Sequence, residues 1–148
     1  MNPRERVYVA LGTNLGDREG YLAKARAALG KLPLTTLIGV SRIEETAPVG
    51  PPGQGKYLNQ MAVLETSLDP GRFLKLLQKI EDENGRVRGE KWGPRTLDLD
   101  IVRFGTRRLR DSDLKVPHPE LPNRDWWGRE IEELDTKYPV KSSDADDE

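Results

Sequence analysis

The chain has 148 residues, of which 35% are hydrophobic and 33% charged, with a formal net charge of −1. This length predicts one globular domain with one core and leaves no room for a second catalytic domain. With no cysteine and one histidine, the chain excludes disulfides, cysteine nucleophiles and zinc sites built on cysteines or on two histidines.

The hydropathy pattern also bears on localisation. The longest unbroken apolar run, residues 7–11, is far shorter than the roughly 20 residues that cross a bilayer. No charged-then-apolar signal segment opens the chain. We therefore expect a cytoplasmic protein with no membrane partner.

The first half of the chain alternates strand and helix signals. Residues 7–11 are β-prone and end at Gly12, and the capping residues that follow lead into apolar side chains spaced as on one helix face. Residues 34–45 predict a second strand, which the Pro- and Gly-rich stretch 47–55 ends. Residues 57–67 predict a third strand.

A second helix and a fourth strand follow. Asp69 as a cap, with Pro70 at the first helical position, predicts a helix that closes at residues 84–85. Residues 97–102 alternate apolar and acidic side chains and predict a strand that Gly105 ends. The order β-α-β-β-α-β predicts an α+β, ferredoxin-like sandwich, in which helices pack on one face of an antiparallel sheet.

The C-terminal part carries weaker signals. Residues 127–134 are compatible with a short helix, whereas residues 141–148 are small, polar and acidic. Such a segment buries too little apolar surface to offset the entropy of ordering it. We therefore expect a single domain over residues 1–140 and a disordered acidic tail over residues 141–148.

Two carboxylates mark the fourth strand. Asp98 and Asp100 are two residues apart, so their side chains project from one face, about 7 Å apart along the strand. A divalent metal could bind between them, since hard cations prefer oxygen ligands. The alternative is an ordinary solvated sheet face with alternating polar residues.

Basic side chains gather around this pair. Residues 86–110 hold eight basic and three acidic side chains, a balance of +5 that would attract an anionic ligand. Carboxylates that hold magnesium, beside arginines that hold phosphate oxygens, are what phosphoryl transfer requires. A basic surface patch, with Trp92 as an ordinary packing aromatic, is the alternative.

Two further segments invite a functional interpretation. Residues 12–17 lie at a strand-to-helix junction but lack the glycine spacing and lysine of a P-loop, so we interpret them as a structural turn. His118, within Val-Pro-His-Pro, could donate to a phosphate oxygen or satisfy a backbone carbonyl, and both roles stay open.

Several motifs stand in the order and spacing of one enzyme family. They are Arg-x-Arg at residues 86–88, Trp-Gly-Pro-Arg-Thr-Leu-Asp-Leu-Asp-Ile at 92–101, Val-Pro-His-Pro at 116–119, and the segments 9–17, 45–50 and 57–59. Over residues 7 to about 124 the chain resembles the 6-hydroxymethyl-7,8-dihydropterin pyrophosphokinases of folate biosynthesis. The resemblance implies a diphosphokinase that transfers a diphosphoryl group from ATP to the pterin hydroxymethyl group and releases AMP.

The resemblance also implies roles for individual residues. Asp98 and Asp100 would hold two Mg²⁺ ions, and Asp98 would also help accept the hydroxyl proton. The catalytic set would be Arg86, Arg95, Asp98 and Asp100. The residues implied to bind ATP are Gln78, Glu81, Arg86, Arg88, Trp92, Arg95, Ile101 and His118. The residues implied to bind the pterin are Thr46, Val49, Tyr57, Asn59, Trp92, Arg124 and Trp126.

The implied partners are these two small molecules, with no nucleic acid, and the implied state is a monomer. The family usually continues beyond the residue 126 aromatic into a Val-Leu-x-Pro-Leu-like stretch, whereas this chain reads Trp-Gly-Arg-Glu-Ile over residues 127–131. A binding protein of the same fold that has lost turnover is therefore one alternative. An RNA-binding module is another, although its central strands would carry aromatics where this chain carries Asp98 and Asp100.

Overall fold

An antiparallel sheet of five strands forms the centre of the molecule, in the computed structural model that describes residues 3–48, 52–85 and 96–140. Its order is β2-β4-β1-β5, and the short β3 also pairs with β4. This is the order of the ferredoxin-like βαββαβ arrangement, so the predicted fold class is confirmed. The strands are β1 (Glu5–Thr13), β2 (Thr35–Val40), β3 (Glu44–Thr46), β4 (Tyr57–Thr66) and β5 (Asp98–Phe104).

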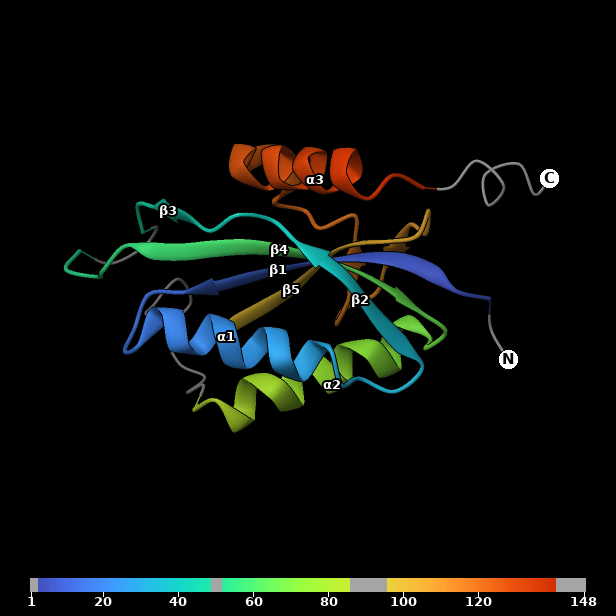
Figure 1. Cartoon of the computed structure of the whole chain (residues 1–148), viewed down its shortest axis with the longest axis horizontal. Coiled ribbons are helices and arrows are strands. Elements are labelled where there is room, and N and C mark those ends of the chain that lie inside the picture. The colour runs from blue at the N-terminus through green and yellow to red at the C-terminus, as the bar shows by residue number, and fades with distance from the viewer. Residues whose placement is uncertain (1–2, 49–51, 86–95, 141–148) are drawn as a thin grey trace.

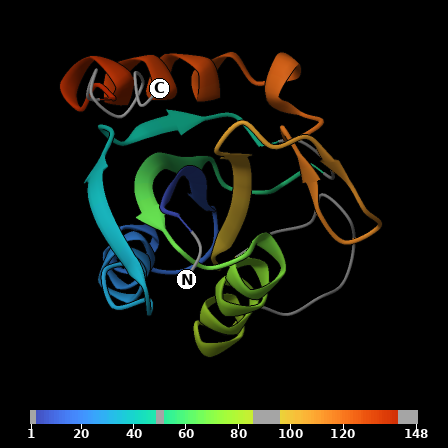
Figure 2. The ribbon, with the colours of Figure 1, turned by 90° about the vertical axis from the view of Figure 1, so that its right-hand side faces the viewer.

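Helices cover both faces of this sheet, and Figures 1 and 2 show the three layers. The two helices of the predicted pattern lie together on one face, and the third helix crosses the opposite face. A two-stranded hairpin and one 3₁₀ turn lead into that third helix. These elements are α1 (Arg18–Leu29), α2 (Pro70–Glu83), β6 (Leu109–Arg110), β7 (Lys115–Val116), η1 (Leu121–Asn123) and α3 (Asp125–Lys137).

The caps of α1 and α2 are those that the sequence predicts. The side chain of Asp17 accepts a hydrogen bond from the backbone N of Gly20, and Asp69 does the same for Arg72. Gly85 has a φ of 77°, the left-handed conformation that ends α2 after Asn84.

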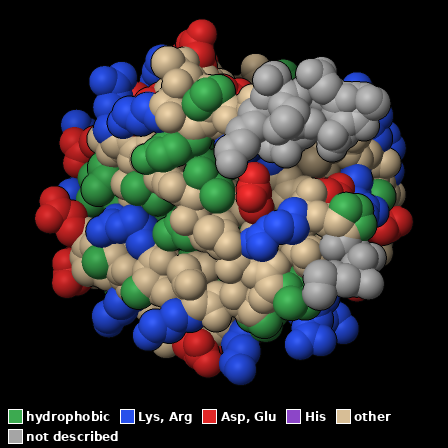
Figure 3. Space-filling view, turned by 45° about the vertical axis from the view of Figure 1, so that its right-hand side comes forward, with side chains coloured by type: hydrophobic (Ala, Val, Ile, Leu, Met, Phe, Trp, Pro, Cys, Tyr) green, Lys and Arg blue, Asp and Glu red, His purple; other side chains and the backbone are tan. Residues whose placement is uncertain are grey.

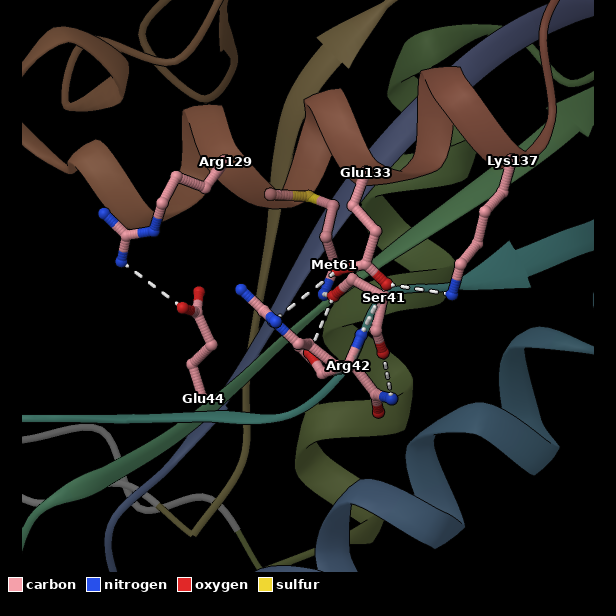
Figure 4. A network of polar contacts seen from close by, with 8 residues as sticks. Ser41, Arg42, Glu44, Met61, Arg129, Glu133 and Lys137 are labelled. Atoms are coloured by element: carbon pink, nitrogen blue, oxygen red, sulfur yellow. Dashed lines mark hydrogen bonds and ion pairs between the residues drawn. The ribbon is translucent and has the colours of Figure 1, made fainter.

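The predicted second strand is interrupted at residues 41–43. The backbone N of Ser41 donates to the backbone oxygen of Met61, as in a strand pair. The backbone N of Met61, however, donates to the side-chain Oγ of Ser41 at 2.9 Å, so a side chain replaces one backbone acceptor of the strand ladder. The backbone N of Arg42 instead donates to Glu133 of α3 at 3.0 Å (Figure 4). The strand therefore divides into β2 and β3, because the segment between them turns toward α3.

The sheet buries two separate apolar clusters. The larger lies against α1 and α2 and contains Leu97, which precedes β5, and Leu99 and Ile101 of β5. The smaller lies under α3 and contains the fully buried Val102, which lies at the bulge in the β1–β5 pairing, together with Trp127 and Leu134. The face that carries Asp98 and Asp100 is thus partly covered by α3 rather than open to solvent along its length.

Surface features of the described ranges agree with the composition. On the face in Figure 3, basic and acidic side chains are interspersed, in keeping with the nearly equal numbers of the two, 24 and 25, in the sequence. None of the helices within these ranges combines the length and the hydrophobicity needed to span a membrane.

Candidate active site

Strand register brings residues from three strands into one row. Gly12 of β1 pairs with Asn59 of β4 on one side and with Asp98 of β5 on the other. Directly opposite residues in antiparallel strands project from the same face, so Asn59 and Asp98 share the face that α3 covers. The next row contains Met61, Ala10 and Asp100 in the same way.

Asp98 and Asp100 therefore point from one sheet face, as the sequence predicts. About a third of the Asp100 side chain is exposed, and its Oδ1 lies 3.8 Å from Nε2 of His118. Within the three described ranges, this site included, no group of three or more His, Asp or Glu side chains gathers in a way that could hold a metal, so the candidate ligands are the two carboxylates alone. Two carboxylates suit Mg²⁺, which uses one or two of them and completes its shell with water and phosphate oxygens.

His118 is oriented by its surroundings. Its backbone N donates to Val102 at 2.9 Å, and its Nδ1 accepts from the backbone N of Glu120 at 3.0 Å. Burial of the ring, followed by the positive charge of Arg124, lowers the pKa of His118 from its ordinary value of 6.5. The imidazole is thus neutral at pH 7, with Nδ1 as the acceptor and the remaining proton on Nε2, directed toward Asp100.

Trp127 supports this histidine, a role that the sequence did not indicate. Its ring meets His118 edge-on at 5.0 Å, and the guanidinium of Arg124 lies over it at 4.6 Å. The signal in the sequence is the three-residue spacing of Arg124 and Trp127 at the start of a helix, which brings two side chains together. Trp126, the predicted pterin-stacking residue, is half-buried against the smaller core, and its Nε1 has no hydrogen-bond partner in the described part of the chain.

The candidate pterin residues gather beside the row described above. The amide nitrogen of Asn59 donates to Oγ1 of Thr46 at 2.7 Å and lies 3.4 Å from the backbone oxygen of Glu44. A Cβ at Gly12 would lie 3.6 Å from the Tyr57 ring and 3.8 Å from Oδ1 of Asn59. Thr46, Tyr57 and Asn59 therefore converge where Gly12 leaves space.

The turn at residues 12–17 anchors the end of the long loop before β4. The side-chain amide of Asn14 donates to Oε1 of Gln54 and to the backbone oxygen of Gly55, each at 3.2 Å. Arg18 donates to the backbone oxygen of Lys56 at 2.8 Å. These contacts agree with a structural turn that holds residues 54–56, the segment directly before Tyr57, in place.

The predicted ATP-side residues of α2 and β5 differ in accessibility. Gln78 is exposed, whereas Glu81 is 4% exposed and accepts from the backbone N of Leu99 at 2.7 Å. Ile101 is 3% exposed and packs into the larger core, so its side chain faces away from Asp98 and Asp100. A ligand beside β5 would meet the backbone of Ile101 rather than its side chain.

The structure thus brings Asp98, Asp100, His118 and Arg124 together on one face and places Thr46, Tyr57 and Asn59 beside them. It keeps Glu81 and Ile101 on the other side of β5. Five predicted site residues lie outside the described residues, namely Val49, Arg86, Arg88, Trp92 and Arg95.

Comparison with known proteins gives a consistent result. A family model described as 7,8-dihydro-6-hydroxymethylpterin-pyrophosphokinase (HPPK) matches residues 8–136. A 2-amino-4-hydroxy-6-hydroxymethyldihydropteridine pyrophosphokinase of Bacillus subtilis is 47% identical over 117 residues, covering 79% of this chain and 70% of its own. The enzyme of that name from Pseudomonas aeruginosa is 47% identical over 120 residues, with 81% and 74% covered. The one from Haemophilus influenzae is 41% identical over 119 residues, with 80% and 74% covered.

Proposed function

The chain belongs to the 7,8-dihydro-6-hydroxymethylpterin-pyrophosphokinase family, and from this premise we propose that it transfers a diphosphoryl group from ATP to 6-hydroxymethyl-7,8-dihydropterin. The hydroxyl oxygen of the pterin attacks the β-phosphorus, the bond from that phosphorus to the α-side bridging oxygen breaks, and AMP leaves. The hydroxyl proton is lost, and the product is the pterin diphosphate of folate biosynthesis.

One observation carries this proposal, the row formed by Asn59, Gly12 and Asp98. With neighbouring strands about 4.8 Å apart, the candidate pterin and metal residues lie roughly 10 Å from one another across a single glycine. A flat pterin beside Asn59 would therefore extend its hydroxymethyl group toward Asp98. This separation suits in-line attack on a phosphate held at the β5 side.

Asp98 and Asp100 would hold two Mg²⁺ ions through their carboxylate oxygens. When bound, such ions neutralise phosphate charge and leave the phosphorus open to attack. His118 contributes an Nε2 proton beside Asp100, where it can donate to a phosphate oxygen. Asp98 is in addition the carboxylate nearest to the pterin side and can accept the hydroxyl proton, directly or through water.

On the pterin side, both N–H groups of the Asn59 amide are engaged with Thr46 and Glu44, so the amide offers its Oδ1 as an acceptor to an N–H at the edge of the heterocycle. Its contact with Thr46 fixes the orientation of that amide. Tyr57 and Trp126 would cover the two faces of the ring. Arg86, Arg88 and Arg95 would hold the triphosphate, Val49 would contact the pterin and the loop of Trp92 would close over the substrates, as the family resemblance implies.

Phosphorus NMR of the purified protein with magnesium, ATP and 6-hydroxymethyl-7,8-dihydropterin tests the proposal. We expect AMP and a pterin diphosphate ester to appear together, and only when both pterin and magnesium are present. ADP with inorganic phosphate would refute diphosphoryl transfer, and absence of any product would indicate a binding protein.

A further inference from the structure

A second polar cluster lies outside the candidate active site, between α3 and the segment that joins β2 to β3. It borders a cavity of about 600 Å³. Figure 4 shows Arg129 of α3 reaching toward Glu44 and Glu133 reaching toward Arg42, with Lys137 beside Glu133. The lining residues are Arg42, Glu44, Arg129, Glu130, Glu132, Glu133, Thr136 and Lys137.

Glu130 is the anomalous member of this cluster. It is 2% exposed, and its carboxyl group lies beside that of Glu44 in the lining of the same cavity. Both carboxyl oxygens of Glu130 and Oε1 of Glu44 are buried and have no hydrogen-bond partner among the residues that the structure describes. Two adjacent carboxyl groups whose oxygens are buried are tolerated when they share one proton, because one can then donate to the other.

Glu44 connects this pair to the candidate pterin residues. Its Oε2 accepts from Arg129 at 3.3 Å, so α3 holds its side chain from two positions. Its backbone oxygen lies 3.4 Å from the Asn59 amide, which donates to Thr46 two residues further along β3. A shift of β3 away from α3 would therefore displace Thr46 and rotate the Asn59 amide.

We propose that Glu130 is a positioning residue for pterin binding: its contact with Glu44 clamps β3 against α3 and so holds Thr46 and Asn59 in place. This inference rests on the proposed function. It concerns affinity for the pterin rather than the chemical step, because Glu130 touches neither candidate substrate site.

Protonation sets the strength of this clamp. Burial, and next the neighbouring Glu44, raise the pKa of Glu130 to about 9. The charged groups that face it are Glu44 from β3 and Arg129 and Glu133 from α3, and Arg42 lies at the rim of the same cavity. Above this pKa two carboxylates oppose one another, so the clamp weakens.

Binding measurements on four proteins test the inference: the wild type, Glu130→Ala, Glu130→Gln and Glu132→Ala. Calorimetry with α,β-methylene-ATP and magnesium gives the Kd of the pterin without turnover. At pH 7 we expect Glu130→Ala to weaken pterin binding about tenfold, the equivalent of one lost buried hydrogen bond, with an unchanged Kd for the ATP analogue. Glu130→Gln keeps a neutral donor and should bind within about twofold of the wild type.

The pH dependence separates positioning from simple support of the fold. Between pH 7.5 and 9.5 the wild type should lose pterin affinity relative to Glu130→Gln, whose side chain does not ionise in this range. Glu132→Ala, an exposed change on the same helix, should follow the wild type.

Three results would overturn the inference: a Glu130→Ala variant with unchanged pterin affinity, equal weakening of the pterin and of the ATP analogue, or parallel pH curves for the wild type and Glu130→Gln. If Glu130→Ala does not fold, the pH comparison decides alone. Failure of the proposed function is seen separately, as absence of AMP from the wild type in the NMR assay.

Discussion

Asp98 and Asp100 owe their position to the two-residue period of β5, and the same geometry predicts their substitution effects. Because their side chains leave a partly exposed face, replacing either by Asn removes a charged candidate metal ligand without opening a cavity. We expect Asp98→Asn and Asp100→Asn to lower kcat at least about a hundredfold with an unchanged far-UV circular dichroism spectrum. Arg103→Ala, an exposed change on the same strand, is the control, and unfolding of either Asn variant would contradict the assignment.

Gly39 offers a second prediction for a single residue. A Cβ at this position would lie 2.4 Å from Cε2 of Tyr138, so the ring occupies the space that a side chain would need. We expect Gly39→Ala to lower the free energy of unfolding by about 1–3 kcal/mol in urea denaturation. Gly128→Ala in α3 is the matched control: nothing lies within 4 Å of its Cβ position, and the change should raise stability by about 0.5–1 kcal/mol. Equal effects of the two changes would refute the packing argument.

Single residues also show where prediction from the sequence succeeds. Asp17 and Asp69 are predictable because a cap bonds to the backbone three residues ahead, within reach of a local pattern. Ser41 and Glu130 are not, because their partners lie 20 and 86 residues away on other elements. For Trp127 the spacing to Arg124 is a local signal, but the contact with His118 depends on how α3 packs. Their roles follow from how α3 docks, which no local spacing encodes.

Among the elements, α3 is held to the sheet by groups whose protonation matters. The folded state raises the pKa of Glu130 from 4.5 to about 9, so this group stabilises the fold fully below pH 4.5 and loses that contribution as the pH rises toward 9. We expect the Tm of the wild type to fall relative to that of Glu130→Gln between pH 5 and pH 9. The corresponding free energy of unfolding falls by at most about 1.4 kcal/mol per pH unit. Differential scanning calorimetry measures both curves, and a constant difference between them would show that Glu130 is already ionised in the folded state.

The order of the strands and helices was predictable from the sequence. The break between β2 and β3 and the sheet face that α3 covers were not. Periodicity gives four strands and two helices because each buries one face against the larger core. It does not separate β2 from β3, since the break arises from the Ser41 side chain and from Glu133 of α3. Nor does it assign α3 to the opposite face, because an amphipathic helix fits either side of a sheet.

At the scale of the whole molecule, the sheet is covered on both sides and residues 141–148 follow the last helix. The composition of that segment, with four acidic residues among eight, gives it little apolar surface to bury. We expect a chain that ends at residue 140 to keep its Tm within about 2 °C and its diphosphokinase activity within about twofold. A larger loss of either, measured side by side with the full chain, would assign the segment a structural or catalytic part. A chain that ends at residue 124, lacking α3, is the opposite control: it should not fold, because the smaller core loses Trp127, Ile131 and Leu134.

The position of α3 has a consequence for motion. The helix closes the smaller core, begins directly after Arg124 and carries Trp126, so opening it would both expose apolar surface and dismantle one wall of the candidate pterin site. A ligand that binds only the closed form therefore slows the opening in proportion to its occupancy. Amide hydrogen exchange along α3 would then report substrate occupancy, with the amides of α1 on the far side of the sheet as an internal reference.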